Sequence, residues 1–100
     1  MRPCAAGSSD AMRVRIGGKY WTLRFSGNLK DYGNMVDPGH AEGRVIRIGT
    51  WQGEQDTLDT IIHEALHCAR PELDEAAVDA TARDVSRLLW RLGYRRTEVQ

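Results

Sequence analysis

The sequence predicts a single small α+β domain in which three short strands precede two helices. Between residues 13 and 50, polar and apolar residues alternate in three short runs, as in strands with one buried face. From residue 58 onward the apolar residues recur every three or four positions, as on one side of a helix. We therefore expect a three-stranded antiparallel sheet, made of a hairpin and an edge strand, packed against two antiparallel helices.

Size and charge limit what this domain can be. We expect one domain over residues 12–95, between a disordered tail at 1–11 and a short tail at 96–100. The chain has 14 Lys and Arg and 14 Asp and Glu, so its net charge is zero, which argues against nucleic acid as a partner. The sequence has no apolar run that could cross a membrane and no signal-peptide core. With two cysteines, we expect reduced thiols in a cytoplasmic protein.

A β-hairpin is predicted first. Residues 13–16 and 21–25 alternate polar and apolar side chains, and between them lies Gly17-Gly18, a pair that suits a two-residue hairpin turn. The polar positions of this hairpin are rich in arginine. We interpret them as a strand face exposed to water rather than as a nucleic-acid surface.

A long loop and a third strand are predicted next. Residues 26–43 are rich in glycine, asparagine and aspartate, which is typical of a loop, and they include His40 and Tyr32. A loop this long in a small domain usually has a function. Residues 44–50 alternate again, and an extended peptide could pair with the free edge of this third strand.

The first helix is predicted to run from Asp56 or Thr57, either of which can be its N-cap, to Arg70-Pro71. Its apolar stripe consists of Leu58, Ile61, Ile62, Ala65, Leu66 and Ala69. We expect this stripe to pack on the sheet.

The second helix is predicted between Asp74, a good N-cap, and Gly93, which suits a left-handed C-terminal position. Its stripe consists of Val78, Ala82, Val85, Leu89 and Leu92. The turn between the helices is short, so we expect antiparallel neighbours.

The first helix carries the pentapeptide H-E-A-L-H at residues 63–67. Its two histidines are four residues apart and share one side of the helix, so both imidazoles can bind one Zn²⁺ at about 2.0–2.1 Å. On a helical wheel with Ile62 at 0°, His63 falls near about 100°, His67 near about 140° and Glu64 near about 200°. The histidines therefore lie beside the apolar stripe. The structural alternative is two exposed histidines without a role.

A third ligand is expected on the second helix or in the long loop. Glu75 ranks first and Asp79 second, because both lie near the inward stripe, where a carboxylate needs a partner. His40 ranks third. Cys68 lies about 100° around the helix from His67 and does not suit the site. The alternative for Glu75 is a favourable interaction with the helix dipole.

Three strands, the segment L-D-T-I-I-H-E-A-L-H and a second helix with an acid resemble the zincin metallopeptidases over residues 12–95. The likeness is to minimal phage or bacterial members with SprT-like or ImmA/IrrE-like cores. It implies that His63 and His67 bind zinc and that Glu64 is the general base. In gluzincin-type members a glutamate on the next helix is the third ligand, which corresponds to Glu75. SprT-like members use a third, downstream histidine, which this chain lacks.

The predicted function is hydrolysis of peptide bonds by a zinc-bound water that Glu64 activates. The oxyanion needs a second electrophile, for which His40, Tyr32 and Arg70 are candidates. The substrate is then a peptide or protein, and a protein partner that completes the cleft is left open. The alternative is a zinc-stabilised structural or interaction module without efficient turnover, which needs the ligands but not Glu64.

Overall fold

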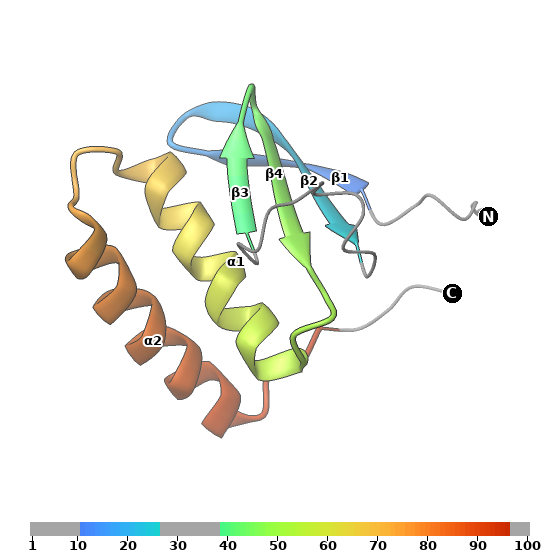
Figure 1. Ribbon diagram of the computed structural model, residues 1–100, viewed down its shortest axis with the longest axis vertical. Helices are drawn as coiled ribbons and strands as arrows, with labels where there is room; N and C mark the ends of the chain where they lie inside the picture. Colours follow the sequence, from blue (N-terminus) through green and yellow to red (C-terminus); the bar gives the residue numbers. More distant parts are fainter. Residues whose placement is uncertain (1–10, 27–38, 97–100) are drawn as a thin grey trace.

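The computed structural model describes residues 11–26 and 39–96. Along this part of the chain the elements are β1 (Ala11–Ile16), β2 (Lys19–Ser26), β3 (Gly39–Glu42), β4 (Val45–Gly49), α1 (Glu54–Ala69) and α2 (Glu75–Leu92), shown in Figure 1. The α+β class is confirmed. Ala11 and Arg96 apart, the predicted tails at 1–11 and 96–100 lie outside the described residues, and so do Cys4 and Tyr32.

The sheet has four strands in the order β1-β2-β4-β3 and is mixed. The predicted hairpin is present, with Gly17 and Gly18 at φ 62° and 79° between antiparallel β1 and β2. The prediction of three antiparallel strands is wrong in two respects, because β2 and β4 are parallel and the predicted loop contains β3. β3 forms its own hairpin with β4 through Gly43 and Arg44, both at positive φ. The four residues of β3 show no alternation from which a strand could be predicted.

The strand register gives the sheet two unlike faces. One face packs toward α1, and its Ile46 and Ile48 are fully buried. The other face carries exposed arginines, as the sequence predicts for the hairpin. Within the described residues, helix therefore covers one side of the sheet (Figure 1).

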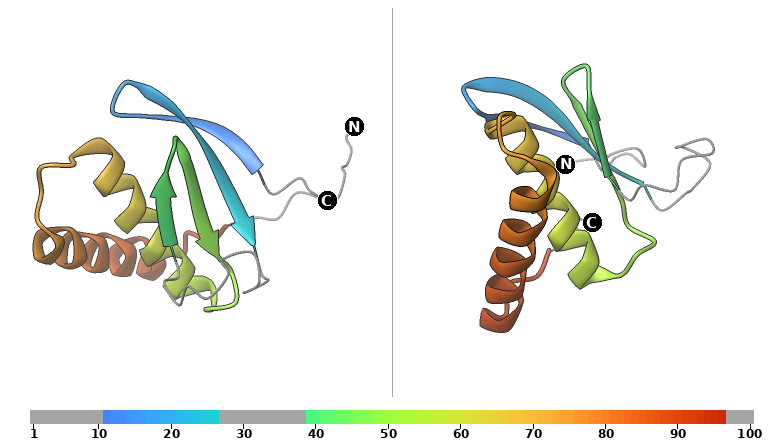
Figure 2. Two further views of the ribbon diagram at one scale, coloured as in Figure 1. Left: turned by 45° about the horizontal axis from the view of Figure 1, so that its top comes forward. Right: turned by 60° about the vertical axis from the view of Figure 1, so that its left-hand side comes forward.

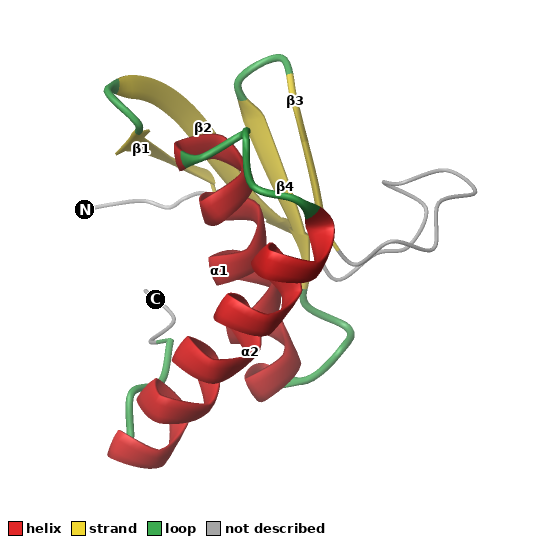
Figure 3. Cartoon of the chain, turned by 90° about the vertical axis from the view of Figure 1, so that its left-hand side faces the viewer, coloured by secondary structure: helices red, strands yellow, loops and turns green. Residues whose placement is uncertain are grey.

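The helices are stacked so that α1 lies between the sheet and α2 (Figures 2 and 3). α1 begins at Glu54 with Gly53 as its N-cap, one turn before the predicted Asp56 or Thr57. Thr57 lies inside this first turn, where its hydroxyl donates to the carbonyl oxygen of Gly53 at 2.5 Å. The predicted end of α1 at Arg70 is confirmed.

The predicted limits of α2 are also confirmed. The Asp74 side chain accepts a hydrogen bond from the Ala77 amide at 2.8 Å, and Gly93 is left-handed with φ 96°.

The edge strand β3 packs on a different side of α1 from the predicted stripe. A Cβ on Gly39 of β3 would lie 2.5 Å from Cγ2 of Thr60 and 2.9 Å from Cγ of Glu64, so β3 packs on that side of α1. Thr60 and Glu64 lie about 160° and 200° from Ile62, opposite the apolar stripe. A helix between two layers needs a contact surface on both sides, which a single-stripe interpretation misses.

The buried face of α2 differs from the predicted stripe by a small rotation. Val78 and Ala82 are fully buried, as predicted, but Val85 and Leu92 are 37% and 65% exposed. Ser86 is buried instead, and its hydroxyl donates to the Arg83 carbonyl oxygen at 3.1 Å, which satisfies the polar group. Residues four apart form one ridge of a helix, so Val78, Ala82 and Ser86 are the ridge that packs on α1.

Candidate metal centre

The short turn after α1 brings the first turns of α2 beside the end of α1 that carries the H-E-A-L-H motif. α1 contributes His63 and His67, and α2 contributes Glu75 and Asp79. The two histidines are partly buried, with side chains 20% and 32% exposed, whereas Glu75 is 65% exposed. The cluster is therefore open to solvent on its α2 side.

Four ligand atoms from three residues converge in this cluster. Nε2 of His63 lies 3.1 Å from Nε2 of His67 and 3.0 Å from Oε2 of Glu75. Nε2 of His67 lies 3.1 Å from Oε1 of Glu75. Ligand atoms at about 2.0–2.1 Å from a tetrahedral zinc ion are about 3.3 Å apart. The donor set therefore fits a zinc ion in both chemistry and spacing.

Asp79 contacts a different atom of the cluster. Its Oδ1 lies 3.0 Å from Nδ1 of His63, on the opposite side of the ring from the converging Nε2 atoms. A carboxylate in this position accepts the Nδ1 proton and fixes the tautomer and orientation of a metal-binding histidine. The geometry therefore favours Glu75 over Asp79 as third ligand and gives Asp79 a supporting role.

This arrangement also brings acceptor atoms face to face. If Nδ1 of His63 donates to Asp79, then Nε2 of the neutral ring holds a lone pair. That lone pair faces a carboxylate oxygen of Glu75 at 3.0 Å. Two acceptors at this distance attract each other only when they share a proton or a metal ion. The contact therefore requires either a second proton on the His63 ring or a metal ion between the two side chains.

Glu64 lies between α1 and the sheet. It is 9% exposed, and a Cβ on Gly39 would come within 3.0 Å of its Oε2 atom. Only glycine lets β3 approach the glutamate so closely. On the helical wheel Glu64 lies far from the apolar stripe, so its burial could not be predicted from the sequence.

A cleft of about 500 Å³ joins these groups. It is lined by β3, α1 and α2, through Gly39, Ala41, Asp59, Thr60, His63, Glu64, His67, Glu75, Asp79 and Arg83. Arg83 follows Glu75 and Asp79 at intervals of four residues, so all three share one side of α2. It is the one Lys or Arg among the described residues that line this cleft. Sequence analysis missed Arg83, although its spacing from Glu75 and Asp79 could have revealed it.

The other candidates from the sequence lie elsewhere. Arg70 forms an ion pair with Glu72 and does not line the cleft. His40 pairs with Arg47 in the β-ladder, and its side chain is outside the described part.

Cys68 is also outside the cleft lining. Burial, with a smaller effect of the Glu64 charge, raises the pKa of the Cys68 thiol to about 11. The thiolate that binds metal is therefore disfavoured there.

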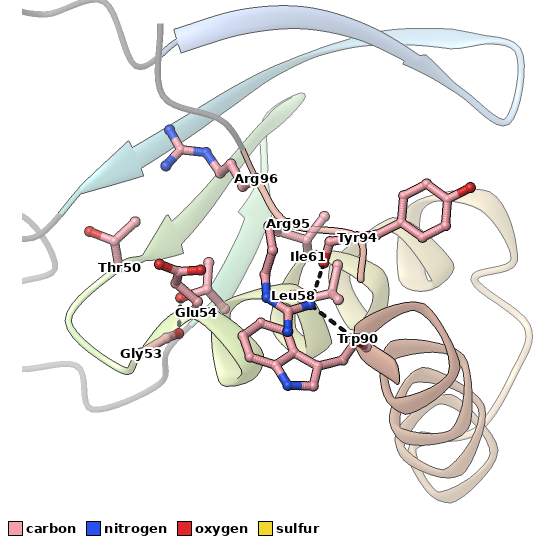
Figure 4. A pocket seen from close by; sticks show the side chains of 10 residues that line it. Thr50, Gly53, Glu54, Leu58, Ile61, Trp90, Tyr94, Arg95 and Arg96 are labelled. Atoms are coloured by element: carbon pink, nitrogen blue, oxygen red, sulfur yellow. Dashed lines mark hydrogen bonds between the residues drawn. The ribbon is translucent and has the colours of Figure 1, made fainter. Parts of the chain in front are cut away.

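A second cavity, of about 480 Å³, lies near the start of α1. Leu58 and Ile61 of α1 face Trp90 of α2 and the C-terminal segment across it (Figure 4). The Arg95 guanidinium stacks on the Trp90 ring, 3.3 Å from its centroid, and donates to two backbone carbonyl oxygens. Among the described residues that line this cavity, Glu54 is the one carboxylate, so they offer no cluster of metal ligands.

Comparisons with protein-family models, curated protein sequences and solved structures found no match for this chain. Neither α1 nor α2 is long and apolar enough to cross a membrane.

Proposed function

We propose that this chain is a zinc-dependent peptidase in which His63, His67 and Glu75 bind the metal and Glu64 is the general base. The observation that supports the proposal most is the convergence of His63, His67 and Glu75, whose facing nitrogen and oxygen atoms lie 3.0–3.1 Å apart. Two imidazoles and one carboxylate are a ligand set of catalytic zinc, which leaves the fourth position to water or substrate. Glu64 is the feature that a purely structural zinc site does not need.

The proposed chemistry divides into separate tasks. When bound, the metal ion would polarise a carbonyl group and lower the pKa of water. Glu64 accepts a proton from the attacking water and returns it to the leaving nitrogen. Asp79 holds the His63 ring with Nε2 directed at the metal position. Arg83 supplies a positive charge at the cleft wall for the oxyanion.

The proposed substrate is an extended peptide. β4 is paired on both sides, so the sequence-based proposal that a peptide pairs with residues 44–50 is wrong. β3 is the edge strand, and its Gly39 and Ala41 line the cleft. A peptide that adds to this edge would lie beside the histidines, with its backbone held by the strand.

A structural zinc module is the second candidate. It is favoured by the position of the donor atoms, which come from both α1 and α2 and would tie the two helices together. α2 packs against α1, so a metal at this point would strengthen that contact without any turnover.

Metal analysis with activity measurement tests the proposal. Wild type, His63→Ala, Glu75→Ala and Glu64→Gln are stripped with chelator, reloaded with one equivalent of Zn²⁺ and assayed on an unfolded protein substrate. Asp84→Asn, an exposed acid of α2 outside the cleft, is the matched control. We expect His63→Ala and Glu75→Ala to lose stoichiometric zinc, and Glu64→Gln to keep zinc but lose at least about 100-fold in rate.

Two results would contradict this assignment. If His63→Ala and Glu75→Ala bind zinc as wild type does, the cluster is not the metal site. If zinc is bound and wild type and Glu64→Gln are equally inactive, the structural module replaces the peptidase.

A further inference from the structure

The outer face of the sheet, turned away from α1, is rich in arginine. The register pairs Arg24 directly with Arg47, and Arg13 and Arg15 follow on the same face of β1. All four are exposed. They are spread over β1, β2 and β4 and form what we call the arginine face.

The zero net charge of the chain does not reveal the arginine face, because basic residues predominate in the sheet and acidic residues in the helices. Residues 11–26 and 44–49 contain six Lys and Arg and no acid. Residues 54–92 contain nine Asp and Glu and four Lys and Arg. Within the described strands the one acid is Glu42 of β3, whose pairing with Val45 places it on the same face as Arg47. The outer face of the sheet is therefore a basic surface, although the net charge of the whole chain is zero. Zero net charge does not argue against an acidic partner at this face.

The arginine face is not neutralised within the described chain. Among the residues that the structure describes, no carboxylate forms an ion pair with Arg13, Arg15, Arg24 or Arg47. Arg13 and Arg15 instead lie over the Tyr20 ring, 4.1 and 5.6 Å from its centroid. Tyr20 itself is 49% exposed. The surface thus presents planar cations stacked over a half-exposed aromatic ring.

We propose that the arginine face binds single-stranded nucleic acid, with its four arginines on phosphates and with Tyr20 stacking against a base. Basic surfaces with exposed aromatic rings bind single strands, because each base offers a flat face that stacks without regard to sequence. A duplex fits less well, because the four arginines are spread over three strands of an open sheet and do not project as a ribbon into a groove. A lipid surface fits less well because the described outward positions offer no large aliphatic side chain for insertion beyond the half-buried Val45. This binding does not depend on the metal centre.

The number of arginines sets the expected salt dependence. Each neutralised phosphate of a single strand contributes about 0.7 to the slope of log affinity against log salt concentration. Four contacts give a slope of about −2.8, so affinity falls about 50-fold between 50 and 200 mM salt.

The proposal can be tested by fluorescence anisotropy, with the full chain and a labelled 20-nucleotide oligothymidylate. A metal chelator is present in the buffer throughout. We expect the oligothymidylate to bind at 50 mM salt, with a slope of log affinity against log salt concentration of about −2.8. Arg24→Gln/Arg47→Gln should reduce the slope by about 1.4, and Tyr20→Leu should weaken binding about 5- to 100-fold through lost stacking. Arg87→Gln/Arg91→Gln removes two exposed arginines of α2 and should bind as wild type does. Circular dichroism checks that each variant is folded.

Four outcomes would overturn the proposal. They are no binding at 50 mM salt, an unchanged slope in Arg24→Gln/Arg47→Gln, tighter binding to a duplex of equal length, and tighter binding to phosphatidylserine vesicles. Because chelator is present throughout, none of these outcomes bears on the peptidase proposal.

Discussion

The helical layer and the outer face of the sheet use charged residues in opposite ways. Between α1 and α2, His63, His67 and Glu75 converge until their donor atoms are 3.0–3.1 Å apart. On the sheet, four arginines lie spread over three strands, with none paired to a described acid. Convergent donors suit one small cation, whereas dispersed cations suit an extended anion. Zero net charge therefore says nothing about either surface.

Loss of the shared core is expected to have the largest effect. Ile48 is fully buried beneath α1 and supports both the cleft and the arginine face. Ile48→Ala should lower the free energy of unfolding by about 2–5 kcal/mol, from lost burial and a new cavity. Urea denaturation measures this. Val45→Ala, on the outer side of the same strand, should cost less, and equal losses would show that the core is not centred on Ile48.

The reactivity of the Cys68 thiol should show how well the β1–β2 turn covers the C-terminal end of α1. A Cβ on Gly17 would lie 3.3 Å from the carbonyl oxygen of Cys68, so the hairpin turn packs on this end of the helix. The pKa of Cys68 is raised from 9.0 to about 11, so less thiolate exists at any pH below 9. In a Cys4→Ser background, we expect alkylation about 100-fold slower than in urea at pH 8, with a rate still rising at pH 10.

One result would contradict the slow alkylation expected for Cys68. A plateau in the native alkylation rate near pH 9, at the level of the unfolded chain, would mean that Cys68 is not buried. The measurement is made in chelator, so that bound metal does not influence the thiol.

The substitution with the smallest expected effect, Asp79→Asn, should change the metal affinity of the cluster without changing nucleic-acid binding by the arginine face. Asp79→Asn keeps the size of the side chain but weakens its interaction with Nδ1 of His63. We expect metal affinity to fall about 10- to 100-fold, while oligothymidylate binding stays unchanged. Competition with a fluorescent zinc chelator measures the affinity. A complete loss of zinc would instead make Asp79 a ligand, and no change would remove its supporting role.

Local signals in the sequence predicted the element ends well. Gly17-Gly18, Asp74 and Gly93 act through backbone conformation and capping, which depend on near neighbours. The spacing that brings His63 and His67 together is equally local. The layer arrangement could not be predicted this way.

The features that could not be predicted depend on contacts between residues far apart in the sequence. β3 is too short to show alternation, and its pairing follows from the β3–β4 hairpin. Glu64 is buried because Gly39 lies against it from another layer. Arg83 enters the cleft only through the way α2 packs on α1. Of these relations, only that of Arg83 leaves a periodic signal, its four-residue spacing from Asp79 and Glu75.

The place of the ligands in one helical hairpin has a consequence for chain entropy. A link between His63 and Glu75 closes a loop of only twelve residues, whereas the parallel pair Leu23 and Ile46 closes one of twenty-three. Closure entropy grows with the logarithm of loop length, so the sheet closure costs about 0.6 kcal/mol more. A metal at the cluster would thus close a shorter loop, at a lower entropic cost, than the parallel pairing in the sheet does.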